Sequence, residues 1–386
     1  MRSRLLVGNL TVVINLALAS ALWSSDVPAP QVDLAKDRLN RSEACGSCHA
    51  AIYEAWRDSM HARSFTDSIF QASVKQATDA HGLKVRKLCL SCHAPVALVS
   101  GDFEVKEAVT REGIGCDFCH SVKSVDLTHR PMPFEVELGG VKRGPFEYLE
   151  SPAHGTAFSS LHRDSPLLCA GCHEYENSSG VAVLATYSEW KEGPYPGLGV
   201  SCQGCHMAIV PGDRVRPEVA VAQDQRLINL HRLVGGSSLS QLRRGLEASI
   251  KEATRREGTV VVKIEVHNVA AGHKVPTGLP PKQVRLLLTA SQSGKEIFSD
   301  ERIYARALVD ETGKPLLTDA DLFLNSVRVA RDTRLGPRER RIERFRFPAP
   351  PGEIVLDARL LYEYKPFEAD AGVRETIQEI HTIVPR

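Results

Sequence analysis

The sequence lacks several features that mark common classes of protein. It has no regular alternation of strand and helix patterns, no glycine-rich phosphate loop, and a formal net charge of only +1 over 386 residues. The first two absences disfavour a nucleotide-binding α/β fold. The nearly balanced charge gives no sign of the strongly basic surface that nucleic-acid binding requires.

Long hydrophobic runs are also missing, except at the N-terminus. Two arginines precede an apolar stretch over residues 5–18, and small-residue cleavage sites follow at 17–21. This order is typical of a secretory signal peptide, so we expect residues 1–21 to be removed on export. An uncleaved membrane anchor is the alternative, but the stretch is short and interrupted by polar residues. We therefore expect a periplasmic or extracellular protein without a transmembrane span in its mature chain.

All ten cysteines are contained in five CxxCH pentapeptides, which read CGSCH, CLSCH, CDFCH, CAGCH and CQGCH. This is the attachment motif of c-type haem, in which two thiols form thioethers and the histidine ligates the iron. We expect five covalently attached haems c, held by Cys45, Cys48, Cys89, Cys92, Cys116, Cys119, Cys169, Cys172, Cys202 and Cys205. The expected iron ligands on one face are His49, His93, His120, His173 and His206. The low aromatic content of 6% fits a core built partly from macrocycle.

Three other uses of these cysteines are less consistent with the pattern. Structural zinc takes CxxC motifs in pairs, whereas five is an odd number and the trailing histidine would have no role. Disulfides are common in exported proteins, but a disulfide within a CxxC motif closes too short a loop to stabilise a fold. Thioredoxin-like chemistry uses one such motif in a βαβ setting.

The second axial ligand of each iron decides between electron transfer and catalysis, because an open position admits substrate. Methionine is scarce, so we expect histidine ligands and low redox potentials. His61 lies in a stretch, residues 49–65, with a helical pattern. On such a helix it would be roughly 18 Å along the axis from His49. Two ligands of one iron are only about 4 Å apart, so His61 would serve a different haem.

Other histidines stand in contexts that also make them candidate ligands. His129 follows the third motif, His154 precedes the fourth, and His231 follows the fifth. His273 lies in the segment GHKVPTG, a predicted loop that can reach into the haem domain. His162 is the first substitute for His129.

The remaining chain divides by its periodicity. We expect residues 22–236 to form a pentahaem domain of helices and irregular segments, with a small hairpin at 134–143. Apolar residues at helical spacing after the cap Ser238 predict a connecting helix over 237–258. From 259 to 386 the period changes to two, which predicts an antiparallel β-sandwich. The expected strands cover 259–267, 284–289, 296–307, 326–330, 340–347 and 354–364.

Several phrases resemble a known family. CGSCHAAIYEAWRDSMHA and GIGCDFCH are similar to segments of the multihaem cytochromes related to the tetrahaem electron acceptor of hydroxylamine oxidation. CAGCHE, TYSEWKEGPY and the GHKVPTG loop resemble segments of larger bacterial multihaem cytochromes. The resemblance implies that His61 and His129 are distal ligands exchanged between the first and third haems. It also implies distal roles for His154, His231 and His273, and the tetrahaem relative keeps one haem open.

These patterns predict an electron carrier that exchanges electrons with other cytochromes or with a membrane quinol-oxidising complex. One alternative is a reductase of a small nitrogen or sulfur compound, with a pocket formed by His162, Arg163 and Asp164. No CxxCK motif is present, so the usual catalytic signature of pentahaem nitrite reductases is missing. A second alternative is a subunit of a conductive filament.

Overall fold

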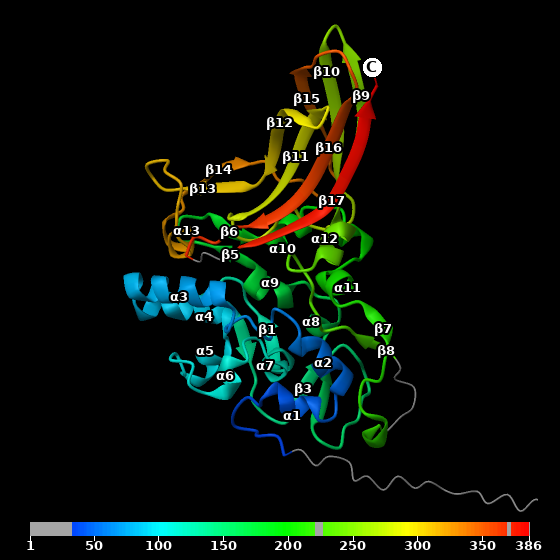
Figure 1. Ribbon diagram of the computed structural model, residues 1–386. Helices are drawn as coiled ribbons and strands as arrows, with labels where there is room; N and C mark the ends of the chain where they lie inside the picture. The colour runs from blue at the N-terminus through cyan, green and yellow to red at the C-terminus, as the bar shows by residue number, and fades with distance from the viewer. Residues whose placement is uncertain (1–32, 221–226, 369–371, 386) are drawn as a thin grey trace, which may run out of the picture.

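The computed structural model describes residues 33–220, 227–368 and 372–385. The predicted signal peptide lies outside these residues. Figure 1 shows a lower part of short helices and loops and an upper part of long strands. Within the described ranges, no helix has the length and apolar character needed to cross a membrane.

The lower part is built from short helices that carry the CxxCH motifs. Cysteines three residues apart on a helical turn lie on one face, so both thiols of a motif can reach one macrocycle. The helices are α1 (Ser42–Gly46), α2 (Ala50–Arg57), α3 (Ser68–His81), α4 (Leu83–His93), α5 (Val96–Ser100), α6 (Ala108–Arg111), α7 (Cys116–Ser121), α8 (Ser160–Arg163), α9 (Leu167–His173), α10 (Thr186–Lys191) and α11 (Cys202–His206). Four motifs lie within α4, α7, α9 and α11, and the first spans the junction of α1 and α2.

Small two-stranded sheets and two 3-10 turns connect these helices. They are β1 (Val122–Val125) with β2 (Phe134–Val136), β3 (Val141–Gly144) with β4 (Gly155–Phe158), β5 (Glu174–Glu176) with β6 (Ala182–Ala185), and β7 (Ile209–Pro211) with β8 (Leu227–Asn229). The 3-10 turns are η1 (Pro196–Leu198) and η2 (Pro217–Val219).

The hairpin predicted at residues 134–143 is wrong. β2 pairs with β1, and β3 runs parallel to β4 instead of returning along β2. The reason is tertiary packing, because the Phe134 ring is buried edge-on against Phe118 at 5.5 Å. Phe134 also packs directly on Gly171 of the fourth motif, where any Cβ would collide with the ring.

The connecting helix predicted over 237–258 is correct only at its start. α12 (Leu239–Gly245) begins at the cap Ser238, whose hydroxyl accepts from the backbone N–H of Gln241. The chain then continues as strand β9 (Leu246–Arg256), which pairs with β10 across a turn at Glu257 and Gly258. Both turn residues have positive φ, as a tight hairpin requires. The apolar spacing fits helix and strand alike, and pairing with β10 decides between them.

The upper part contains two packed antiparallel sheets. One has the order β15–β10–β9 and the other β12–β11–β16–β17. Their strands are β10 (Thr259–Asn268), β11 (Lys282–Gln292), β12 (Lys295–Tyr304), β15 (Arg340–Pro348), β16 (Ile354–Tyr364) and β17 (Val373–Val384). Alternate residues of both sheets form one buried core, including Val262, Leu286 and Leu356. β9 and β17 are strands that the sequence patterns did not predict.

A side element places the sandwich against the haem-binding part. It consists of β13 (Arg306–Val309), helix α13 (Asp319–Asn325) and β14 (Arg328–Asp332), and Figure 1 shows α13 above α3. Ala320 of α13 is buried against Ala77 and Val85, and Cys89 packs on the same cluster. The sandwich therefore covers the neighbourhood of the second motif.

Candidate haem-binding site

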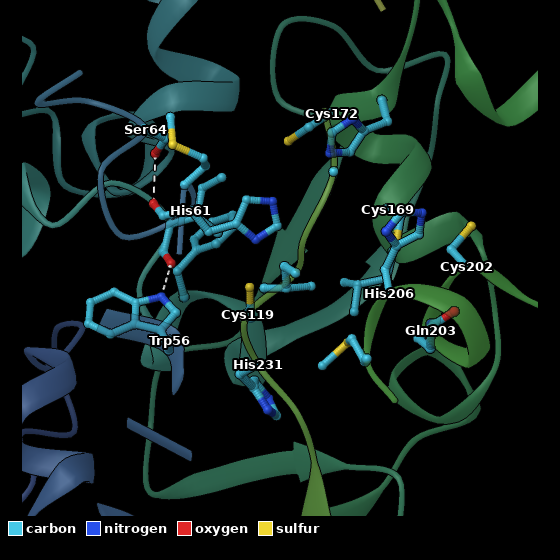
Figure 2. A pocket seen from close by; sticks show the side chains of 18 of the residues that line it. Trp56, His61, Ser64, Cys119, Cys169, Cys172, Cys202, Gln203, His206 and His231 are labelled. Carbon is cyan, nitrogen blue, oxygen red and sulfur yellow. Dashed lines mark hydrogen bonds between the residues drawn. The ribbon is translucent and has the colours of Figure 1, made fainter. Parts of the chain in front are cut away.

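A single large cavity runs through the lower part and reaches the lower end of the sandwich. Its volume is about 1950 Å³, and all ten cysteines line it. A pocket for one drug-sized ligand has only about 300–1,000 Å³, so this cavity has room for several large groups. Figure 2 shows His61, His206 and His231 converging on it, together with thiols from the third, fourth and fifth motifs.

Four pairs of histidine rings face each other across the cavity at one separation. Each pair joins a motif histidine to a histidine from elsewhere in the chain. The ring centres are 6.3 Å apart for His49–His154, His61–His173 and His120–His231, and 6.4 Å apart for His206–His273. A metal about 2 Å from each nitrogen would place the ring centres roughly 6 Å apart, since each centre lies about 1 Å behind its nitrogen. The four pairs therefore have the spacing of two axial ligands of one iron.

Hydrogen bonds fix which nitrogen of most of these rings is free. Nδ1 donates to a backbone carbonyl in His49, His93, His120, His154, His206, His231 and His273. A carbonyl can only accept, so Nδ1 carries the proton and Nε2 keeps its lone pair. Metal-ligating histidines are commonly oriented in this way.

Burial also keeps several of these rings in the neutral form that a metal needs. It lowers the pKa of His61, His120, His231 and His273 to about 4. The pKa of His173 falls to about 3 for the same reason, with a further contribution from the neighbouring His61. These groups are uncharged at neutral pH.

The second motif differs from the others. Within the described ranges, no other histidine ring faces His93 at the separation of the four pairs. The Phe70 ring stacks flat on the His93 imidazole, 3.8 Å between centres, so it lies beside the ligand and not across an iron from it. The face opposite His93 therefore has no histidine partner in this part of the chain.

The cavity wall also presents cationic groups suited to the carboxylates of haem. Nη1 of Arg143 is buried and has no hydrogen-bond partner among the residues that the structure describes. It lies in the cavity wall, and the Arg143 carbonyl accepts from His120. An unsatisfied buried donor calls for a missing acceptor, and a haem propionate at the third motif would supply one. The thiols, paired rings and cations thus fit c-type haem.

A buried ion network fixes the loop that carries His273. Arg334 contacts Glu189 of α10 at 2.6 Å, and both side chains are at most 5% exposed. Arg334 also donates to both oxygens of Asp332, and Thr277 donates to Glu189 at 2.8 Å. These contacts join the sandwich to the haem-binding part at the position where His273 enters the cavity.

Known proteins share both sequence and fold with this chain. A family model described as "Cytochrome c554 and c-prime" matches residues 44–121. Cytochrome c-554 of Nitrosomonas europaea is 26% identical over 153 residues, which cover 37% of this chain and 61% of that protein. The crystal structure of a penta-heme cytochrome c552 from Thermochromatium tepidum has a TM-score of 0.71 at 21% identity, covering 91% of this chain and 100% of that one.

The chain is a multihaem c-type cytochrome related to the cytochrome c554 family. The family model matches the segment with the first three CxxCH motifs, whereas the likeness to the solved structure extends over the sandwich as well. The cytochrome therefore shares its two-part fold with a pentahaem protein. It covers only 61% of the curated relative's length.

The position of His61 in the cytochrome differs from the predicted helix and from the exchange between the first and third haems, whereas the expectation that His61 does not face His49 agrees with the structure. Residues 49–65 do not form one helix, because α2 ends at Arg57 and a series of turns follows. The His61 carbonyl accepts from Ser64 and from the backbone N–H of Ile114, which aims the ring at the cavity. Gly113 has positive φ, and a Cβ there would lie 2.7 Å from this carbonyl. His61 faces His173 of the fourth motif, not a histidine of the first or third.

His129 does not reach the cavity. It lies exposed in a turn where its backbone N–H donates to Asp126, so the structure gives it no place opposite an iron. Its nearness to the third motif in sequence sets no direction for the side chain. His231 occupies the position across from His120 instead.

His162 lies closer to His120, at 5.5 Å, but both of its nitrogens are engaged. Nδ1 contacts the Ser159 hydroxyl, and Nε2 donates to the Cys119 carbonyl at 2.8 Å. His162 therefore supports the third motif from the side. Because these contacts use both ring nitrogens, His162 has no free nitrogen for the catalytic pocket considered with Arg163 and Asp164.

Replacing His231 with alanine tests this assignment. We expect the oxidised variant to lose one low-spin iron and gain one high-spin iron, since His120 would be left without a partner. Electron paramagnetic resonance of the purified protein counts both species. His129→Ala is the matched control and should leave the spectrum unchanged; the opposite pattern would restore His129 as the ligand.

Proposed function

We propose that this chain is an exported electron-transfer protein that binds five c-type haems, four of them ligated by two histidines. The observation that carries the proposal is the set of four histidine pairs at 6.3–6.4 Å. c-Type haem supplies one-electron chemistry at its iron, and two histidine ligands favour low potential and electron transfer over substrate binding. The protein's task is to hold the macrocycles close together and to set their potentials.

The closeness of the attachment points supports transfer between the haems. The Cys116 thiol is the leading cause that raises the pKa of Cys45, so the first and third motifs adjoin. In the same way, the Cys92 thiol is the leading cause that raises the pKa of Cys172, and the Cys202 thiol is the leading cause for Cys169. The fourth motif therefore adjoins both the second and the fifth. Haems fastened at adjoining points would be close neighbours, as short-range electron tunnelling requires.

Export is part of the proposal. The N-terminal pattern is that of a signal peptide, and thioether attachment takes place after export. Redox proteins of the periplasm or of a quinol-oxidising membrane complex are the partners that such a carrier would serve.

A count of the irons by spin state tests the proposal. We expect the oxidised protein to show four low-spin irons and one high-spin iron per chain, because no histidine of the described residues faces His93. Electron paramagnetic resonance gives the count, and the mass of the intact mature chain gives the number of haems. A mass equal to that of the polypeptide alone, or mostly high-spin iron, would refute it.

One observation favours a second activity at the second haem site, the site of Cys89, Cys92 and His93. An iron held by His93 alone could bind a small molecule from solution, as a reductase of a nitrogen or sulfur compound requires. A filament in which a neighbouring chain lends the missing ligand would also leave the monomer one ligand short. Spectra of the monomeric and the assembled fractions from size-exclusion chromatography separate the two, since only the reductase keeps an iron that responds to added ligand in the assembled fraction.

A further inference from the structure

The sandwich presents an ammonium group and a carboxyl group to the cavity near the second haem site. Lys282, the first residue of β11, and Asp319, the first residue of α13, both line the cavity. Neither belongs to a CxxCH motif or to a histidine pair.

Lys282 has no carboxylate within ion-pair distance in the described part of the chain. Its Nζ lies 5.7 Å from the centre of the Tyr364 ring and close to Gly278, where a Cβ would be only 3.2 Å away. Burial lowers the pKa of Lys282, and Asp319 partly offsets this. Lys282 is half-buried in the cavity wall, where a cation without a counter-ion is costly, so this ammonium is expected to meet an anion that the polypeptide does not supply.

Asp319 has an oxygen that is also without a partner. Its Oδ1 is buried and accepts no hydrogen bond from any described residue. The backbone N–H of Asp319 donates to Glu368, and Ser73 of α3 donates to the same carboxylate. Burial, followed by the charge of Glu368, raises the pKa of Asp319 to about 6. The unpaired oxygen can therefore take up a proton at mildly acidic pH, near 6, and donate a hydrogen bond.

Both groups lie near the second haem site. Ala320, next to Asp319, packs in the cluster that contains Cys89, and the Asp319 charge raises the pKa of Cys89 after burial itself. Lys282 is among the charges that lower the pKa of His93. The charge of Lys282 also lowers the pKa of His173 and His273, but each of those rings already faces a second histidine. Among the described residues, only the second site lacks a facing histidine, so an iron held by His93 would have a position free for an outside ligand.

We propose that Lys282 and Asp319 form a binding pocket for a small anion at the open face of the second haem. Lys282 supplies the positive charge, and Asp319 donates a hydrogen bond when protonated. The fitting ligands are small monoanions with nitrogen or oxygen donors, of which nitrite is one. This inference rests on the proposed open iron at the second site and names the class of ligand for it. The charged and titratable groups that face Asp319 are Lys282, Glu368, Tyr364 and Cys89, whose thiol would become a thioether on haem attachment.

The test is nitrite binding to the oxidised holoprotein, followed by the Soret shift and by the high-spin resonance. Lys282→Met is expected to weaken nitrite binding at least about tenfold, since a desolvated charge at short range is lost. Lys282→Arg should retain most of the affinity. Asp319→Asn is expected to strengthen binding at pH 7.5, where the wild-type carboxylate is ionised and repels the anion. Carbon monoxide binding to the reduced protein, which involves no charge, should stay within about threefold in every variant.

Lys295→Met is the matched control, because Lys295 is exposed on β12 and does not line the cavity. Unchanged nitrite affinity in Lys282→Met, or an equal loss in Lys295→Met, would overturn the pocket and leave Lys282 as a partner of haem carboxylates. A wild-type protein with no high-spin iron and no Soret response would instead refute the open site itself. Retention of the four low-spin signals shows that a variant has folded.

Discussion

Replacing Arg334 with methionine is expected to lower the free energy of unfolding by about 3–5 kcal/mol, since it leaves the buried carboxylate of Glu189 without a counter-charge. Glu189 belongs to the haem-binding part and Arg334 to the sandwich, so the change also loosens the contact between them. The Arg334 guanidinium contacts the Pro276 carbonyl in the His273 loop as well. We therefore expect His273 to leave the fifth iron, and that haem to become high-spin.

Chemical denaturation and electron paramagnetic resonance measure the two effects separately. Arg331→Met is the matched control, because Arg331 is exposed on the neighbouring strand β14. Arg334→Lys should be intermediate, since a single ammonium cannot reproduce the forked contacts to Asp332. A Met variant with the wild-type denaturation midpoint and spectrum would show that the network does not hold the loop.

Replacing His61 with methionine is expected to raise the potential of the fourth haem by on the order of 100 mV, because a thioether ligand stabilises reduced iron relative to imidazole. The fourth motif adjoins the second and the fifth. The Cys119 thiol of the third motif also raises the pKa of Cys169 and Cys172, so the third motif is close as well. A raised potential at this position would trap electrons between the two ends of the haem array. We expect slower transfer across the protein as well as a shifted midpoint.

A spectroelectrochemical titration resolves the potentials, and stopped-flow reduction followed by reoxidation reports the transfer rate. His129→Met provides the control, because His129 is exposed and lies outside the cavity wall. If the titrations of wild type and His61→Met superimpose, His61 is not an iron ligand and the pair His61–His173 has another purpose.

The haem-attachment motifs can be recognised in the sequence because their chemistry is local. Two thiols and a histidine within five residues must meet one macrocycle, whatever the rest of the chain does. The strands of the sandwich follow similarly from alternation, as in β10, where every second residue is buried. β9 was missed because its apolar residues also fit a helix, and only its pairing with β10 settles the matter.

The partners of the motif histidines are a long-range property and were predicted less well. His154, His231 and His273 were candidates from their contexts, and the structure places each across from a motif histidine. His129 had a similar context, yet a single exposed turn directs it away. No sequence pattern marks Lys282 and Asp319 as site residues, because their closeness depends on how α13 and β11 fold onto the haem-binding part.

The loop with His273 also has a consequence for biogenesis. His206 is synthesised well before the strands that present His273, so the fifth haem of the proposed exported protein would at first have a ligand on one face only. The lyase that forms the thioethers would work on a chain whose last ligand is not yet in place. Completion of the fifth centre would thus report that the chain has been made and folded at least as far as the His273 loop, and a chain that ends before this loop would differ in its absorption spectrum.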